Sequence, residues 1–264
     1  MSRLGSLSLA DSNALGECRA MFLIATVVVL TVASAETEAT QPDPGVKYSS
    51  CLQQVKIDAK AAVKVASTWA EAGGGVPARH CEALALIELD RPEEAGNVLI
   101  GIGFDESVGD LDVRADLLSQ AGNAFLLASK AEKARKALDG AIALRPGDPD
   151  LLIDRARSYA MEASWAPAIA DLTAAIAIVP SRAAPYVLRA SAKRQSGDAR
   201  GAKNDLELAL QREDGNVDAL VERGLLYAAA GETEGARADF NSVIAAAPDS
   251  PAGALAKTEL AKLP

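Results

Sequence analysis

Residues 115–250 repeat one order of small and large apolar positions in four consecutive blocks of 34 residues. Each block has an alanine in a fixed column, a large apolar residue four positions later, and a small or β-branched residue three positions after that. The upstream half of each block has a second apolar stripe at helical spacing. Because self-similarity at a fixed period indicates stacked supersecondary units, the pattern predicts two antiparallel helices in every block. The alanine column consists of Ala134, Ala168, Ala202 and Ala236.

The small–large–small order of these columns resembles the tetratricopeptide (TPR) repeat, and Lys193 and Asp214 in the third block are its main departures. The resemblance implies an all-α, right-handed α-solenoid of stacked antiparallel helix pairs, with four TPR repeats at residues 115–250. Residues 251–264 are expected to form a C-terminal capping helix. A terminal element must cover its neighbour's apolar face and present a polar face to water.

Two divergent TPR-like repeats are expected upstream, at residues 46–104, where the same columns recur less regularly. Ala95 and Leu99 match the columns well, whereas Ala62 and Trp69 match them imperfectly. The next spacing is longer than one period, and residues 105–114 contain several acids, so we expect an acidic loop there. The acids do not follow the order of an EF-hand, which disfavours a calcium site.

Residues 1–35 have the pattern of a signal peptide. Arg19 precedes the apolar run Met21–Thr31, and small residues follow this run before the expected cleavage site. A start at Met21 would remove Arg19 and weaken this interpretation. An uncleaved anchor is the alternative, although the run is shorter than the ~20 residues of a spanning helix. Residues 36–45 lack periodicity and are expected to be a flexible linker. The signal peptide predicts a periplasmic or secreted protein.

Composition narrows the classes of function. The net charge of −9 argues against a nucleic-acid partner, which would require a basic face. The chain has one histidine, His80, and no serine or cysteine stands in a recognisable nucleophile motif. We therefore expect neither enzyme activity nor a cofactor.

Cys51 and Cys81 are the two cysteines that remain after removal of the predicted signal peptide. Since exported chains meet an oxidising compartment, we expect a disulfide between them. Buried free thiols are the alternative for a cytoplasmic protein, and low-pKa thiols would instead suit a redox factor. A metal site is disfavoured because His80 and Cys81 would point about 100° apart on one helix, and no fourth ligand is apparent.

Two columns of opposite charge recur 16 positions apart in the last three blocks, whereas the first block has Ala121 and Ala137 in the same columns. Since both charges are present or both absent, we expect structural ion pairs that tie a first helix to a second, within a repeat or to the next. The alternative is an exposed pair worth less than ~1 kcal/mol. The basic column consists of Arg155, Arg189 and Arg223, and the acidic column consists of Asp171, Asp205 and Asp239.

The resemblance also implies a concave groove lined by the first helices of the repeats, in which similar proteins hold peptides or partner domains. The side chains carried over would suit an extended or helical peptide with apolar anchors and some acid. The alternative is that many of them pack only against the next repeat. The predicted groove residues are Leu126, Leu127, Ile153, Arg157, Met161, Val187, Arg194, Val221 and Leu225.

The main expectation is therefore an exported protein–protein interaction scaffold that binds a protein or peptide. A membrane-tethered structural subunit of an envelope complex is one alternative, and it requires an uncleaved signal segment. A thiol redox factor using Cys51 and Cys81 is a less favoured alternative. The sequence leaves the oligomeric state open.

Overall fold

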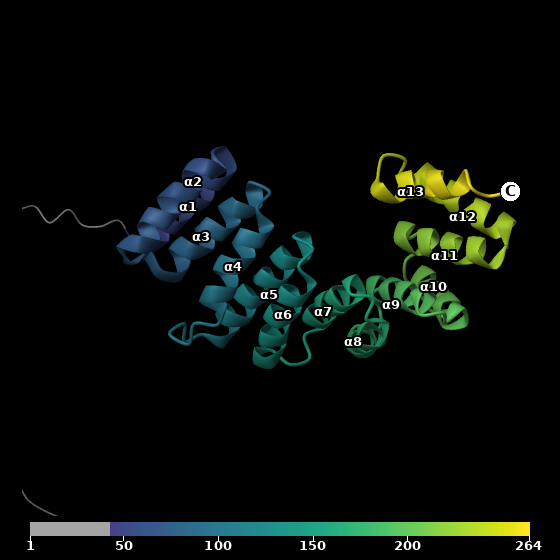
Figure 1. The fold of residues 1–264 in the computed structure, drawn as a ribbon, viewed down its shortest axis with the longest axis horizontal. Helices are drawn as coiled ribbons and strands as arrows, with labels where there is room; N and C mark the ends of the chain where they lie inside the picture. Colours follow the sequence, from purple (N-terminus) through teal and green to yellow (C-terminus); the bar gives the residue numbers. More distant parts are fainter. Residues whose placement is uncertain (1–42) are drawn as a thin grey trace, which may run out of the picture. The chain divides into compact units, whose positions relative to one another are not determined.

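The computed structural model describes residues 43–264 (Figure 1). The predicted signal peptide at residues 1–35 and most of the predicted linker at residues 36–45 lie outside this range. Within it, no helix is both long enough and apolar enough to cross a membrane.

All regular secondary structure in residues 43–264 is helical. The first helices of the successive pairs are α1 (Pro44–Ile57), α3 (Gly75–Glu88), α5 (Leu111–Leu127), α7 (Pro149–Met161), α9 (Ala184–Gln195) and α11 (Val217–Ala230). The second helices are α2 (Ala59–Trp69), α4 (Pro92–Gly103), α6 (Ala131–Leu144), α8 (Trp165–Ile178), α10 (Ala199–Arg212) and α12 (Thr233–Ala246). A short π-helical segment, η1 (Ala70–Gly74), follows α2, and α13 (Pro251–Leu260) comes last.

Each first helix packs against the second helix of its own pair, and each second helix packs against the first helix of the next pair (Figure 1). Helix α13 continues this order by packing on α12 and α11. The predicted all-α solenoid of stacked helix pairs is therefore confirmed.

The repeated small and large columns form the contact between paired helices. The four column alanines are fully buried, and the large residues four positions later are at most 2% exposed. Gly122 marks a close approach of α5 and α6, because a Cβ atom added there would lie 2.6 Å from Leu138 Cγ. Gly224 stands in the same way against Phe240. A small side chain at these crossings lets the helix backbones approach, and the large side chain fills the space beside them.

Capping side chains fix where several helices begin. Asp148 accepts hydrogen bonds from the backbone of Asp150 and Leu151, and Pro149 occupies the first turn of α7. Ser250 similarly accepts a hydrogen bond from Gly253 N at the start of α13. Between α2 and α3 the chain turns through Gly73, whose φ of 87° is in the left-handed region that favours glycine.

Capping also corrects two predicted boundaries. Helix α5 begins at Leu111, inside the predicted loop at residues 105–114, because Asp110 accepts hydrogen bonds from the backbone of Asp112 and Val113. Helix α1 begins at Pro44, inside the predicted linker at residues 36–45, because Asp43 accepts a hydrogen bond from Gly45 N. Asp43 and Asp110, which the sequence placed in a linker and a loop, are therefore the N-cap residues of helices α1 and α5.

Replacing Gly122 with alanine is expected to lower the free energy of unfolding by about 1–3 kcal/mol relative to Gly101→Ala. A methyl group at residue 122 would overlap Leu138, whereas one at residue 101 meets nothing within 4 Å. Both changes replace a glycine inside a helix, so the gain in helix propensity cancels in the comparison. Urea denaturation measures the difference, and equal stability of the two variants would contradict close packing at Gly122.

Candidate partner-binding groove

Helices α7, α9, α11 and α13 line a groove of about 420 Å³. Its apolar lining includes Val187 on α9, Val221 on α11 and Leu255 on α13, and Leu255 is 40% exposed. Arg157 on α7 and Glu222 on α11 add opposite charges. The groove is thus built from first helices, with the capping helix standing where the next first helix would be.

The nine residues predicted for the groove differ in exposure. Leu127, Met161 and Arg157 are exposed, Leu126, Arg194 and Leu225 are half-buried, and Ile153, Val187 and Val221 are buried. Three of the nine, Arg157, Val187 and Val221, line the 420 Å³ groove. The prediction is wrong for Ile153 as an accessible contact. This side chain is 4% exposed and belongs to the apolar cluster that joins α7, α8 and α9.

Charged partners within the protein already hold the two predicted groove arginines. Arg157 Nη1 lies 2.6 Å from Asp154 Oδ1. Arg194 Nε lies 3.0 Å from Glu222 Oε2, and Ser191 Oγ also donates to Glu222. Burial is the main cause that raises the pKa of Asp154, against the lowering effect of Arg157. The expected attraction for an acidic peptide is therefore weakened, because both guanidinium charges are balanced internally.

Asp154 and Glu222, the two acids that pair with these arginines, belong to one repeat column that was not among the predicted groove positions. Asp154, Leu188 and Glu222 stand 34 residues apart. Asp154 lies beside Asn123 of the preceding first helix, and Glu222 accepts from Ser191 of the preceding first helix. The 34-residue period could have identified this column, because it also gave the predicted groove positions.

The three predicted arginine–aspartate combinations lie together. In each, the arginine Nε and Nη2 atoms donate to the two carboxylate oxygens at distances of 2.6–2.8 Å. The pairs join α7 to α8, α9 to α10 and α11 to α12, so each one lies within a repeat. The carboxylates are nearly buried: Asp171 is 8% exposed, Asp205 2% and Asp239 5%.

The third arginine nitrogen extends the contact to the preceding repeat. Arg155 Nη1 donates to Asp139 Oδ1 on α6 at 2.8 Å, and Arg189 Nη1 donates to Thr173 Oγ1 on α8 at 3.0 Å. The pKa of Arg155 is raised above its ordinary value, chiefly by the hydrogen bonds with Asp171. One arginine therefore fixes a first helix to the second helices on both of its sides.

Lys193, a departure from the repeat pattern, has a partner in this network. Its Nζ atom lies 2.8 Å from Asp205 Oδ2, so this carboxylate binds Arg189 and Lys193 together. The same column holds Phe125, Tyr159 and Tyr227 in the other blocks. In the third repeat, Lys193 paired with Asp205 therefore occupies the position that an aromatic side chain occupies in the other repeats.

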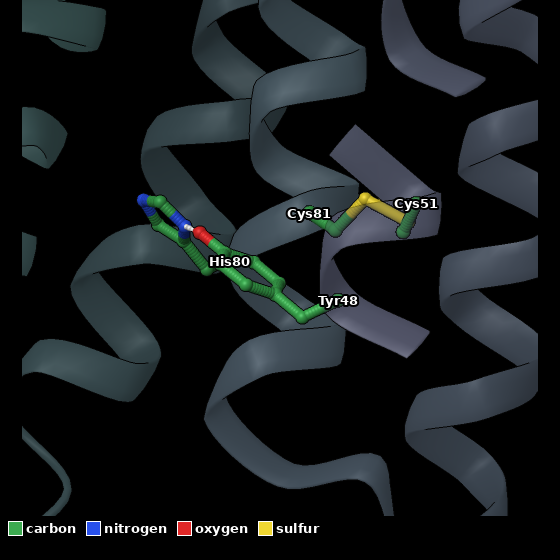
Figure 2. The surroundings of a disulfide bond; sticks show 4 residues. All are labelled: Tyr48, Cys51, His80 and Cys81. Carbon is green, nitrogen blue, oxygen red and sulfur yellow. Dashed lines mark hydrogen bonds between the residues drawn. A yellow bond between two sulfur atoms is a disulfide. The ribbon is translucent and has the colours of Figure 1, made fainter. Parts of the chain in front are cut away.

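Cys51 on α1 and Cys81 on α3 are joined by a disulfide in the structure (Figure 2). Their Cα atoms are 6.3 Å apart, and the two residues are 3% and 0% exposed. The bond connects the first helices of the two divergent repeats. Among residues 43–264, no group of three or more His, Cys, Asp or Glu residues is arranged to hold a metal ion.

A hydrogen-bonded chain beside the disulfide joins three first helices. Tyr48 Oη on α1 lies 2.6 Å from His80 Nδ1 on α3 (Figure 2). On the other side of the ring, His80 Nε2 lies 2.8 Å from Gln120 Oε1 on α5. Because the Gln120 carboxamide oxygen only accepts, His80 Nε2 is the donor of the hydrogen bond between these two side chains. Burial raises the pKa of the Tyr48 hydroxyl. Sequence reasoning missed this chain because its members are 32 and 40 residues apart.

Comparisons with known proteins find the same repeat. The family model described as "Tetratricopeptide repeat" matches residues 193–260. Tetratricopeptide repeat protein 36 of Danio rerio is 42% identical over 82 residues, which cover 30% of this chain and 44% of the relative. The protein of that name from Bos taurus is 31% identical over 142 residues, covering 52% of this chain and 67% of the relative. This chain thus spans less than half the length of the first relative.

The solved structure of a tetratricopeptide repeat protein from Parabacteroides merdae aligns with a TM-score of 0.59 at 16% identity. The alignment covers 84% of this chain and 85% of that one. At this identity the similarity supports the fold alone.

Replacing Asp205 with alanine is expected to lower the free energy of unfolding by about 3 kcal/mol, because Arg189 and Lys193 would lose their shared counter-charge. Their side chains are only 13% and 19% exposed. Asp139→Ala is the matched control, since its side chain is 51% exposed and its loss should cost at most ~1 kcal/mol. Chemical denaturation measures both, and an equal loss would contradict the special position of Asp205.

Removing the disulfide by Cys51→Ala and Cys81→Ala is expected to lower the free energy of unfolding by roughly 3–4 kcal/mol in the chain-entropy model. Reduction of the unmutated protein should have the same effect. Alkylation without reduction, followed by peptide mass spectrometry, tests the bond directly. Alkyl groups on both Cys51 and Cys81 would mean free thiols and would refute the pairing.

Proposed function

The chain belongs to the tetratricopeptide repeat family, and we propose that it is an exported scaffold that binds a segment of a partner protein in the groove of α7, α9, α11 and α13. The fold is a protein–protein interaction fold, and its members are generally not enzymes. The partner class is therefore protein or peptide.

The observation that carries this proposal is the 420 Å³ groove on the first helices. Apolar side chains of α9, α11 and α13, such as Leu188, Val221 and Leu255, line it together. Apolar side chains supplied by successive helices suit a segment that presents apolar side chains at regular intervals.

The charges of the groove refine the expected segment. Arg157 is paired with Asp154, and Glu222 is paired with Arg194, so neither charge is free to select a strongly acidic or basic peptide. We therefore expect the affinity to come from apolar anchors, with the ion-paired groups forming a polar rim that fixes orientation.

Export is the second part of the proposal. It is supported by the order of Arg19, the apolar run and small residues in the sequence, and a stable Cys51–Cys81 disulfide would be consistent with an oxidising compartment. The burial of both cysteines disfavours a thiol redox factor, because exchange requires an accessible sulfur. A mature mass that lacks 35 residues would exclude a membrane tether.

Site-specific photo-crosslinking in intact cells tests the groove. A photoreactive residue at Leu255 is expected to capture a specific partner protein. The same residue at Ile178, on α8 and outside the groove, is the control, since its exposure of 47% is close to the 40% of Leu255. Leu255→Asp should reduce binding of the identified partner at least ~10-fold, because it places a charge among apolar anchors.

Circular dichroism of Leu255→Asp and Ile178→Asp separates binding from folding. Both variants should retain their helix content, because both side chains are already exposed. Capture of the same proteins from both positions, or of none from Leu255, would contradict the groove as the binding site.

A further inference from the structure

A second groove lies at the N-terminal end of the described chain, between α1 and α2. Its volume is about 830 Å³. Val46 on α1 and Val65 on α2 line it and are 61% and 54% exposed, and Trp69 also contributes to the lining. This exposure is high for valine side chains. Helices α1 and α2 each contribute one of the two valines to the same groove.

The stacking of the repeats explains why this groove is open. Every later first helix packs against the second helix of the pair before it, as α3 packs on α2 and α5 on α4. Within residues 43–264 no helix precedes α1. The open side of α1 presents Val46, Gln54 and Ile57, which follow each other at helical spacing, and Ile57 is 80% exposed. The groove therefore has the form of a helix-packing surface on which no helix of residues 43–264 lies.

The charge of this end differs from that of the rest of the protein. Helices α1 and α2 contain four lysines and no aspartate or glutamate, although the whole chain has a net charge of −9. Lys47 and Lys64 line the groove, one from each helix. The two acids nearest in sequence, Asp43 and Asp58, cap the helix N-termini.

We propose that this groove binds one amphipathic helix of a partner protein, with its apolar stripe between α1 and α2 and acidic side chains beside Lys47 and Lys64. This site is separate from the groove of the proposed function, which α7 to α13 form. Opposite charges steer association and fix orientation, and the hollow between two helices suits the ridge of a third.

The same charges disfavour the other occupants. Two copies of the chain that met through this groove would bring their lysine-bearing helices together, which costs electrostatic free energy. The chain's own apolar run at residues 21–31 contains no acidic residue to meet Lys47 and Lys64. A membrane would match the lysines, but a flat lipid surface would leave the hollow unfilled.

Trp69 fluorescence provides a direct binding assay. The chain has two tryptophans, so Trp165→Phe leaves Trp69 in the groove as the single reporter. The probes are two synthetic helical peptides with the same leucine stripe at helical spacing, one flanked by glutamates and the other by lysines. We expect the glutamate peptide to bind at least ~10-fold more tightly at low salt, with a smaller preference at high salt.

Charge reversal supplies the decisive comparison. Lys47→Glu with Lys64→Glu should invert the preference, so that the lysine peptide binds more tightly. Lys136→Glu with Arg200→Glu makes the same change in net charge with two exposed residues outside the groove, and it should leave the preference unchanged. Inversion by both double variants would assign the effect to net charge and overturn the proposal.

The remaining outcomes identify other occupants, and each would overturn the proposal. Failure of both peptides to bind excludes an acidic helix. Binding that appears only after removal of residues 1–35 would place the chain's own N-terminal segment in the groove. A dimer that Val65→Asp dissociates would indicate a second copy. Co-sedimentation with phosphatidylglycerol vesicles, without peptide binding, would indicate a membrane surface.

Discussion

Close approach of helix backbones is the constraint on which the rest of the described chain depends. A column alanine or glycine at each crossing leaves room for a leucine or phenylalanine of the paired helix, as Gly122 does for Leu138 and Gly224 for Phe240. With 4% aromatic residues, the protein has few bulky side chains to fill wider gaps. Its core is therefore a series of thin contacts between neighbouring helices, and each contact tolerates little change in volume.

The buried arginine–aspartate pairs add orientation to this packing. An alanine crossing alone allows helices to slide, whereas a guanidinium that binds both oxygens of a carboxylate defines one register. Arg155 and Arg189 also bind the preceding second helix, so they couple neighbouring repeats as well as paired helices. The first regular repeat uses buried Ala121 and Ala137 instead, and there the contact depends on apolar packing.

The same stacking rule determines which surfaces remain available. Second helices are covered by the next first helix, while first helices present one side to a shared groove at α7, α9, α11 and α13. At the C-terminal end, α13 covers the last pair with a helix whose Ala256 is fully buried. At the N-terminal end, the described chain places no helix over α1 and α2, and apolar and basic side chains stay exposed there. Apolar side chains therefore stay exposed in the described chain where a repeat lacks a neighbour.

The sequence by itself determined the helix pairs, their order, the column of small residues and the two columns of opposite charge. All of these follow from one period of 34 residues, which places chemically equivalent side chains in equivalent positions. The sequence also singled out Cys51 and Cys81, because it leaves no other pair after the predicted signal peptide.

Only the tertiary structure decided which column members are accessible. Ile153 and Leu255 both belong to first helices or their continuation, yet Ile153 is 4% exposed and Leu255 is 40% exposed, because neighbouring helices cover the first and not the second. The contacts of Tyr48, His80 and Gln120, and the groove between α1 and α2, were likewise invisible in the pattern. These contacts and this groove involve side chains far apart in sequence, in repeats that diverge from the regular columns. Their positions are therefore set by tertiary packing and not by the 34-residue period.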